Sequence, residues 1–251
     1  MQQVNKTVIK SMDILTLFRT YPSLTLNEII DLTGTPKTSA YRMVSALTEM
    51  GFLEKDQNGK YTLGLVFLEF GQLVKDRLDL RNIAVPIMEH LRDDLKEAVH
   101  LAVRDQNEAI YIDKLDTDQP VRLFTKVGRR SPLYAGACSR VLLSYAEDRE
   151  TYIDETPLTP ISSGTITDKR QLLDRCLQTR REGFTISHSE LEENTTSVAA
   201  PVYDASGAVI AAISIAGPDI RFGEERLERL TEKVKEGAFQ ISEKLGWKRS
   251  S

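Results

Sequence analysis

The sequence has little cysteine, no long apolar run and no excess of basic residues. Its two cysteines, Cys138 and Cys176, stand far apart and outside any CxxC or Cys/His cluster, which argues against a disulfide framework and a zinc site. The N-terminus lacks the apolar core of a signal peptide, and no stretch reaches the ~20 apolar residues of a membrane span. We therefore expect a cytoplasmic protein with no membrane contact.

Short motifs of common enzymes are absent as well. There is no Walker A, GxGxxG or HExxH segment, and Ser139 does not stand in the G-x-S-x-G elbow of hydrolases. The acidic run at residues 190–193 has the composition of paired catalytic carboxylates, but we interpret it as a solvated, helix-capping loop. We interpret His90 and His100 as structural residues. These features argue against an enzyme and predict no cofactor.

The overall charge does not indicate a nucleic-acid partner, because 33 Lys and Arg face 37 Asp and Glu, a net charge of -4. The balance differs along the chain, however. Residues 1–64 carry 7 basic against 6 acidic side chains, and the remainder carries 26 against 31. An N-terminal segment so close to neutrality binds DNA only if its few cations share one face.

Apolar spacing and capping signals predict three helices at the N-terminus. Apolar side chains recur every three or four residues over 7–20, as on one face of a helix. Thr25 and Glu28 have the spacing of a capping box for a short second helix, and Gly34 is free to end that helix in a left-handed conformation. A third helix is expected over 36–50.

Two short extended runs, 52–55 and 60–63, follow the third helix. The connection between them ends in Asn58-Gly59, which is a strong hairpin signal between runs of this kind. Three helices with a tight turn between the second and the third, followed by a hairpin, predict a winged helix-turn-helix domain over residues 1–64.

The third helix begins with polar and basic side chains, at the place where a recognition helix meets base edges and flanking phosphates. The two lysines beside the wing tip can hold the adjacent DNA backbone, and the threonine at the start of the second helix joins the same set. An adaptor that had lost DNA contact would carry acidic residues in place of Lys37 and Arg42. The predicted DNA contacts are Thr25, Lys37, Thr38, Ser39, Tyr41, Arg42, Lys55 and Lys60.

After the wing the pattern changes twice. Residues 65–97 contain a helix with an unusually apolar surface and a second helix that we expect to open at Pro86, and together they read as a rigid connector. Residues 98–251 alternate strands and helices, which predicts an α+β domain with helices packed on an antiparallel sheet. The expected strands include 99–103, 109–112, 121–127, 198–203 and 209–216, and the expected helices are 135–145, 168–181 and 222–245.

Four segments in order resemble the IclR-type bacterial transcriptional regulators over essentially the whole chain. They are LTLNEIIDLTGTPKTSAYRMVSALTEMGFL, YTLG, SPLYAGACSRVLLSY and SELEENTTSVAAPVYDASGAVIAAISIAGP. The resemblance implies a winged-helix domain, a connector that dimerises, and a GAF-like effector-binding domain in a dimer or tetramer. A connector helix with so many apolar side chains on its surface is expected to be buried against a second chain.

The resemblance also implies an effector pocket between the mid-chain helix and the last strands. Small carboxylates or aromatic acids are the implied ligands, and a helix N-terminus with small side chains suits an anion. The family often has an acidic residue near position 188, where this chain has Ser-His-Ser. By position, the implied lining residues are Gly136, Ala137, Ser187, His188, Ser197 and Ser214.

These observations predict a regulator that binds a pseudo-palindromic double-stranded DNA operator and responds to a small organic acid. A repressor is favoured over an activator of the same family. Effector binding would change operator affinity by a coupling free energy of typically about 1–3 kcal/mol. A small-molecule enzyme on the α+β domain is the alternative from another class, and it lacks a nucleophile–base or metal set.

Overall fold

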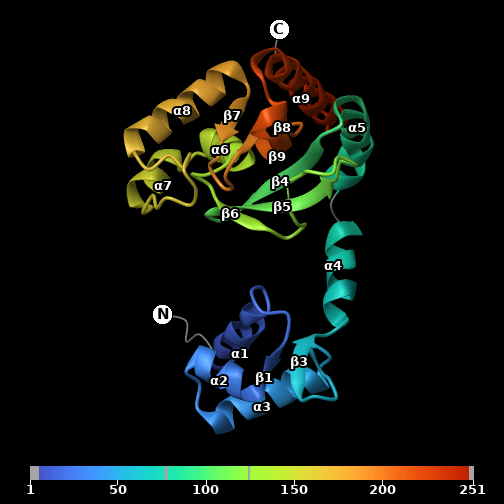
Figure 1. Cartoon of the computed structure of the whole chain (residues 1–251), viewed down its shortest axis with the longest axis vertical. Coiled ribbons are helices and arrows are strands. Elements are labelled where there is room, and N and C mark those ends of the chain that lie inside the picture. The colour runs from blue at the N-terminus through green and yellow to red at the C-terminus, as the bar shows by residue number, and fades with distance from the viewer. Residues whose placement is uncertain (1–5, 77–78, 124, 249–251) are drawn as a thin grey trace. The chain divides into compact units, whose positions relative to one another are not determined.

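The computed structural model describes residues 6–76, 79–123 and 125–248 (Figure 1). The chain divides into two compact units, Met1–Leu78 and Asp79–Ser251. The first boundary therefore falls inside the segment 65–97 that we expect to be a connector. The predicted domain limits at 64 and 97 stay predictions.

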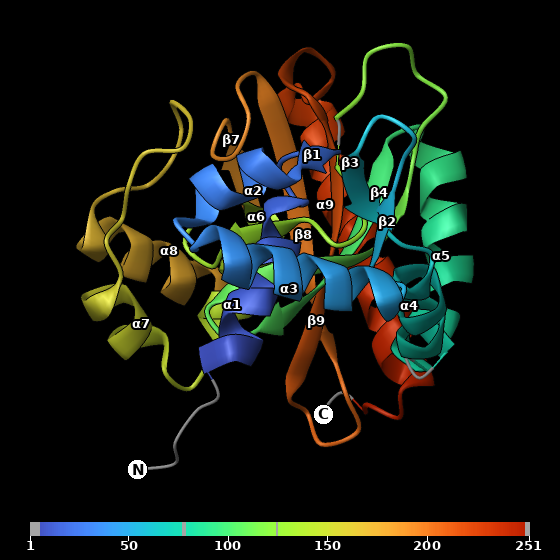
Figure 2. The same ribbon diagram turned by 90° about the horizontal axis from the view of Figure 1, so that it is seen from below.

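Within residues 6–76, the N-terminal unit consists of three helices, a small sheet and a fourth helix. The sheet has the order β1-β3-β2, with antiparallel pairs, and helix α3 runs across the front of this unit in the view of Figure 2. Its core contains Ile14, Ile29, Val44 and Leu53 from different elements. The elements are α1 (Lys6–Leu17), β1 (Leu24–Thr25), α2 (Leu26–Thr33), α3 (Lys37–Glu49), β2 (Leu53–Lys55), β3 (Lys60–Leu63) and α4 (Val66–Asp76).

The local signals in this unit are confirmed. The Thr25 side chain accepts a hydrogen bond from the Glu28 backbone N–H, and the Glu28 carboxylate accepts one from the Thr25 backbone N–H, which together form the capping box of α2. Gly34 ends that helix at φ 62° and donates its N–H to the Ile30 carbonyl. Gly59 lies at φ 78° in the β2–β3 hairpin, a conformation that glycine adopts without a steric penalty.

The C-terminal unit is built on one antiparallel sheet with helices on both faces. The strand order is β6-β5-β4-β9-β8-β7, and every neighbouring pair is antiparallel. Its strands are β4 (Ala98–Asp105), β5 (Glu108–Leu115), β6 (Arg130–Pro132), β7 (Thr185–His188), β8 (Thr195–Tyr203) and β9 (Val209–Pro218). Its helices are α5 (Asp79–Leu95), α6 (Ala137–Tyr145), α7 (Arg149–Glu155), α8 (Lys169–Glu182), the short 3-10 helix η1 (Asp219–Arg221) and α9 (Glu224–Lys244).

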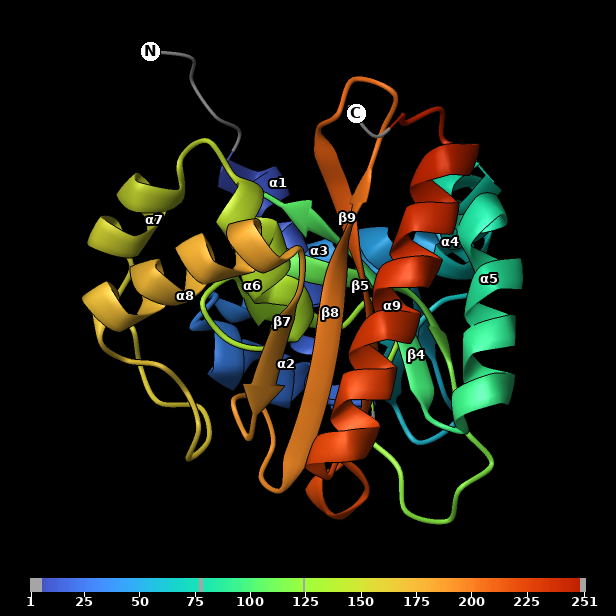
Figure 3. The ribbon, with the colours of Figure 1, turned by 90° about the horizontal axis from the view of Figure 1, so that it is seen from above.

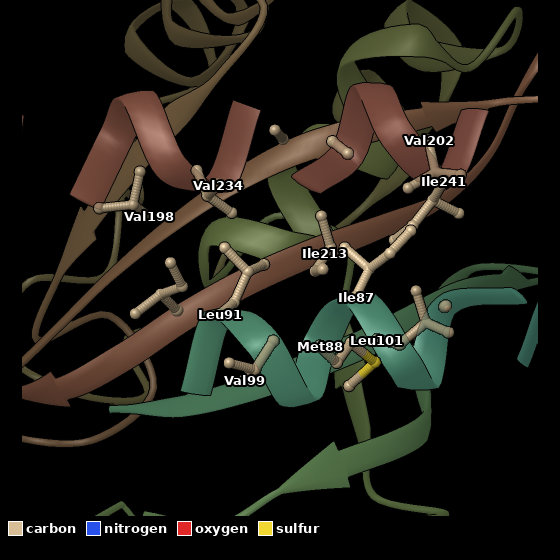
Figure 4. Close-up of a cluster of buried hydrophobic side chains, with 14 of the residues drawn as sticks. Ile87, Met88, Leu91, Val99, Leu101, Val198, Val202, Ile213, Val234 and Ile241 are labelled. Carbon is tan, nitrogen blue, oxygen red and sulfur yellow. The ribbon is translucent and has the colours of Figure 1, made fainter. Parts of the chain in front are cut away.

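The two sheet faces carry two separate cores. Helices α5 and α9 lie side by side on one face, and α6, α7 and α8 group together on the other (Figure 3). In the first core, side chains of α5 and α9 such as Leu91 and Val234 point toward Leu101, Val198 and Ile213 of the sheet (Figure 4). The second core contains alanines of the sheet beneath α6. The predicted α+β fold is confirmed.

Two sequence predictions on this unit are wrong. Pro86 does not open a helix but lies inside α5. The helix tolerates it because Pro86 and Asn82, whose carbonyl loses its partner, are both on the exposed side, where water can bind. Residues 121–123 and 125–127 form a loop instead of a strand. Side chains and not a neighbouring strand bind two of its backbone acceptors: Arg221 donates to the Val121 carbonyl at 2.9 Å, and Lys114 donates to the Thr125 carbonyl at 2.5 Å.

Candidate functional site

The exposed face of α3 gathers most of the predicted DNA contacts. Ala40, Val44 and Leu47 face the core, and the intervening positions therefore point outward. The outward side chains include Tyr41, which is 59% exposed although it is a large aromatic residue. Lys37, Thr38, Tyr41 and Arg42 are all exposed, and Ser39 is half-buried. A helix turn with this composition can donate hydrogen bonds to phosphates and base edges.

The cations of this unit are available to an external anion. Within the described part of the chain, no carboxylate forms an ion pair with Lys37, Arg42 or Lys60. Lys55 lies with its Nζ 5.4 Å from the centre of the Tyr61 ring, a cation–π distance that holds it at the wing. The unpaired charges on α3 and the wing favour a polyanionic partner.

Thr25 has a different local role from the other predicted contacts. It pairs with Lys60 in the register of β1 and β3, so the start of α2 lies beside the wing. Its hydroxyl is already engaged, because it donates to the Glu28 carboxylate at 2.8 Å. The hydrogen bonds from the Thr25 backbone and hydroxyl lower the pKa of Glu28 and keep the cap ionised. Thr25 thus positions α2, and a DNA contact by its side chain stays a prediction.

In the C-terminal unit, four polar side chains form a strip on the sheet face that α6 covers, one on each of four neighbouring strands. Along β4, Val99 and Leu101 belong to the α5–α9 core, so His100 between them faces α6. His100 pairs with Ser214 of β9. Ser197 of β8 pairs with Ser187 of β7, and their hydroxyl oxygens lie 2.7 Å apart.

A small cavity lies at this polar strip, beneath the amino end of α6. Its volume is about 30 Å³, which is enough for about two water molecules. The neighbouring sheet positions are alanines (Ala102, Ala199, Ala212), whose small size lets α6 lie close to the strands. The lining residues are His100, Tyr111, Leu123, Thr125, Arg129, Gly136, Ala137, Cys138, Ser187, Glu190, Leu191, Glu192, Thr195, Ser197 and Ser214.

The structure brings together all but one of the residues that the resemblance placed in the pocket. Gly136, Ala137, Ser187, Ser197 and Ser214 line the cavity. His188 does not, because alternate residues of a strand face opposite ways and Ser187 is the one that faces α6. His188 is exposed, and its Nδ1 lies 2.9 Å from the Thr196 hydroxyl.

His100 and Cys138 line the cavity although sequence reasoning gave neither a site role. His100 is buried, which lowers its pKa to about 4, and the charges of Lys114 and Arg129 also lower it. Its imidazole is therefore neutral near pH 7. Burial raises the pKa of the Cys138 thiol to about 12, so this sulfur stays protonated and unreactive. A single histidine in an apolar strand carries no sequence signal that separates a pocket residue from a structural one.

The sequence predicts a solvated, helix-capping loop for the acidic run; for Glu190 the solvated part is wrong, whereas its carboxylate does bind the amino end of α6. Glu190 is only 5% exposed. One of its oxygens accepts a hydrogen bond from the Gly136 N–H at 2.8 Å, and the other accepts one from Nη1 of the buried Arg140 at 2.6 Å. Its negative charge lies at the amino end of α6, where the helix dipole favours it. The Gly136 N–H is therefore not free for a ligand.

The next amides of α6 remain open to an anion. The first N–H groups of a helix have no acceptor within the helix. Ala137 and Cys138 occupy these positions, and their N–H groups bond no other residue of the described chain. Beyond Glu190, Glu192 pairs with Arg129 at 2.5 Å, and Glu193 accepts hydrogen bonds from Ser162 and Ser163.

Comparison with known proteins agrees with this arrangement. Residues 72–243 match the family described as bacterial transcriptional regulator IclR C-terminal, and residues 7–57 match the IclR helix-turn-helix domain. The chain belongs to the IclR family of bacterial transcriptional regulators. It is accordingly a DNA-binding helix-turn-helix regulator and not an enzyme, and its C-terminal unit is the effector-binding domain of the IclR family.

Relatives of known name cover nearly the whole chain. The HTH-type transcriptional regulator KipR of Bacillus subtilis is 57% identical over 98% of this chain and 100% of its own length. The regulator KdgR of Escherichia coli is 30% identical over 96% of this chain and 92% of its own length. An IclR homologue from Microbacterium hydrocarbonoxydans, solved in complex with 4-hydroxybenzoate, is 27% identical with a TM-score of 0.84, covering 96% of this chain and 99% of its own.

Two other site classes find no support in the described residues of this IclR-family chain. Among them there is no group of three or more His, Cys, Asp and Glu side chains that could hold a metal ion. Nor is any helix of residues 6–76, 79–123 or 125–248 long and apolar enough to cross a membrane.

Proposed function

We propose that this chain is a repressor that binds a pseudo-palindromic operator as a homodimer and releases it when a small organic acid enters the cavity beneath α6. The observation that carries the proposal is the joint presence of an exposed, unpaired basic helix in one unit and a polar cavity at a helix amino end in the other. Each part supports one half of a ligand-controlled DNA switch.

DNA contact is assigned to α3 and the wing. Lys37, Thr38, Ser39, Tyr41 and Arg42 would enter the major groove, where the first turns of a recognition helix read bases. The wing lysines, Lys55 and Lys60, would hold phosphates and contribute affinity without sequence preference. Their exposure supports these roles.

The effector is assigned to the cavity through the hydrogen-bond donors that are open there. A carboxylate suits the unpartnered amides of Ala137 and Cys138, and the hydroxyls of Ser197 and Ser214 can orient it. At about 30 Å³ the cavity is too small for such an acid, so binding requires its lining side chains to move apart. Leu191, which packs against Gly136, is one of these side chains. The complex of the Microbacterium homologue with 4-hydroxybenzoate supports an acid as ligand.

Dimerisation is assigned to the connector around α4. Leu65, Leu68, Phe70 and Leu73 are exposed, with Leu68 at 72%. Such a concentration of exposed apolar groups favours burial against a second chain. A homodimer or a tetramer built from it would present two recognition helices to two half-sites. We keep residues 65–97 as the proposed connector between the DNA-binding domain, 1–64, and the effector domain, 98–251.

Repression is favoured over activation by one comparison. The HTH-type transcriptional repressor AllR of Escherichia coli is 32% identical over 85% of this chain and 80% of its own length. Activation of transcription by the same DNA-bound form is the alternative outcome of a reporter assay.

Fluorescence anisotropy tests the proposal with a labelled duplex from upstream of the protein's own gene and a scrambled duplex of equal length. We expect tighter binding to the first duplex and a loss of this preference in Arg42→Ala. Lys10→Ala is the matched control, because Lys10 is an exposed cation on α1 instead of α3. Equal affinity of wild type for both duplexes, or an unchanged Arg42→Ala, would contradict the assignment.

A further inference from the structure

His100 is a buried polar side chain whose Nε2 atom has no hydrogen-bond partner among the described residues. The residue is 2% exposed in the middle of β4, and no described donor or acceptor reaches its Nε2. Its ring packs edge-on against Tyr111 with the ring centres 5.7 Å apart, a contact that uses the ring and not the nitrogen. Nearly all buried polar atoms in native proteins have a hydrogen-bond partner. We therefore expect the Nε2 atom of His100 to bind a group that is not part of this chain.

The position of His100 indicates where that partner would lie. His100 lines the same cavity as Ala137, Ser197 and Ser214. It enters the cavity from β4, whereas the open amides belong to the amino end of α6, so the two kinds of group come from different layers of the domain. A ligand filling the cavity would therefore meet two separate polar ends.

Burial keeps the His100 imidazole neutral by lowering its pKa, and two of the three charges that act on it work in the same direction, while that of Asp116 opposes them. Lys114 is its register partner on β5, and Arg129 lines the same cavity; both are cationic and oppose a second positive charge. On β9 it faces the Ser214 hydroxyl, and on α6 the protonated Cys138 thiol. A neutral imidazole offers one donor and one acceptor, which suits a hydroxyl or keto oxygen better than a carboxylate.

We propose that His100 is a specificity-determining residue that hydrogen-bonds a second polar group of the effector, so that the regulator prefers hydroxy or keto acids to the same acids without that group. The carboxylate of such an acid would lie at the Ala137 and Cys138 amides, and its hydroxyl or keto oxygen would meet Nε2 of His100. This inference rests on the proposed binding of an organic acid in the cavity.

Isothermal titration of the full-length protein tests it with acids that differ only in one hydroxyl. The pairs are propanoate with lactate and benzoate with 4-hydroxybenzoate, which sample two ligand sizes. In at least one pair we expect wild type to bind the hydroxy acid about tenfold more tightly, the ratio that one hydrogen bond of about 1.4 kcal/mol provides. His100→Phe should bind both members of that pair with the affinity that wild type has for the plain acid.

Two further variants separate recognition from general damage. His100→Gln keeps a neutral donor and acceptor and should retain part of the preference. His90→Gln, on the exposed surface of α5, should behave as wild type. If His100→Phe does not fold, nuclear magnetic resonance of ¹⁵N-histidine-labelled wild type gives the answer, because the hydroxy acid should shift the His100 ring nitrogens and leave those of His90 unchanged.

The possible failures are distinguishable. If wild type binds the acids but without a hydroxyl preference, or if His100→Phe keeps that preference, His100 does not read the second group and the acid-binding cavity stands. If no acid of either pair binds wild type, the organic-acid effector is wrong and the role of His100 falls with it. An unchanged His100 resonance in an acid-saturated sample would also overturn the inference.

Discussion

Replacing Glu190 with glutamine should destabilise the effector-binding unit, because this carboxylate joins two buried donors. Glu190 accepts from the Gly136 N–H at 2.8 Å and from Arg140 Nη1 at 2.6 Å, and Arg140 is only 1% exposed. Glutamine has nearly the same size but one oxygen, so its NH₂ group would face either the Gly136 N–H or the Arg140 guanidinium. Breaking a buried ion pair by removing one charge costs about 3–5 kcal/mol.

The lost free energy is measurable because the chain has one tryptophan in the right place. Trp247 stacks on Tyr203 with the ring centres 4.6 Å apart, so its fluorescence reports unfolding of the C-terminal unit. Urea titration should show a loss of about 3–5 kcal/mol for Glu190→Gln and for Arg140→Met. The double variant Arg140→Met/Glu190→Gln should lose less than the two single variants together, since it leaves no uncompensated charge.

Glu193→Gln is the control, because Glu193 lies in the same loop but is exposed. It should leave the urea midpoint close to that of the wild type, because exposed charges contribute little to stability. A loss below about 1 kcal/mol for Glu190→Gln, or strictly additive losses in the double variant, would refute the reasoning that this pair is buried, coupled and responsible for fixing the end of α6.

Four further outcomes are expected. Arg42→Ala should weaken operator binding by about 1–3 kcal/mol if it reads a base edge, as measured by anisotropy at fixed salt. Lys60→Ala should weaken binding to all sequences alike and reduce the slope of log affinity against log salt by about 1, as a lost phosphate contact does. Ala137→Val adds two methyl groups at a cavity of about 30 Å³ and should block it, so that operator binding persists in gel-shift assays while added acid no longer releases the DNA; continued release would mean that the acid binds elsewhere. The pKa of His100 is lowered to about 4 in the folded protein, so the unfolded chain takes up the proton first and stability is lost as pH falls from about 6.5 to 4, by up to about 3 kcal/mol. Urea midpoints at pH 7 and pH 4.5 should therefore differ less in His100→Gln than in wild type, and equal differences would contradict the neutral, buried imidazole.

Local chemistry along the chain determined most of the secondary structure. The capping box of Thr25 and Glu28, the left-handed end at Gly34 and the hairpin at Gly59 each depend on residues a few positions apart, so they are predictable from sequence and are confirmed. The sequence predicts a helix that begins at Pro86, whereas Pro86 lies inside α5. A proline in mid-helix is tolerated where the freed carbonyl can bind water, and that depends on packing.

The candidate site, too, has features that the sequence predicts and features that only the structure reveals. The sequence by itself, through periodicity and resemblance, determined the winged helix, the α+β domain and the serines on the face toward α6. Only the tertiary structure decided that Glu190 is buried against Arg140, that His188 faces away and that His100 enters the cavity. The physical reason is that burial and pairing are properties of a residue's surroundings: Glu190 and Arg140 are 50 residues apart in the chain, and only folding of the sheet against α6 brings their charges together.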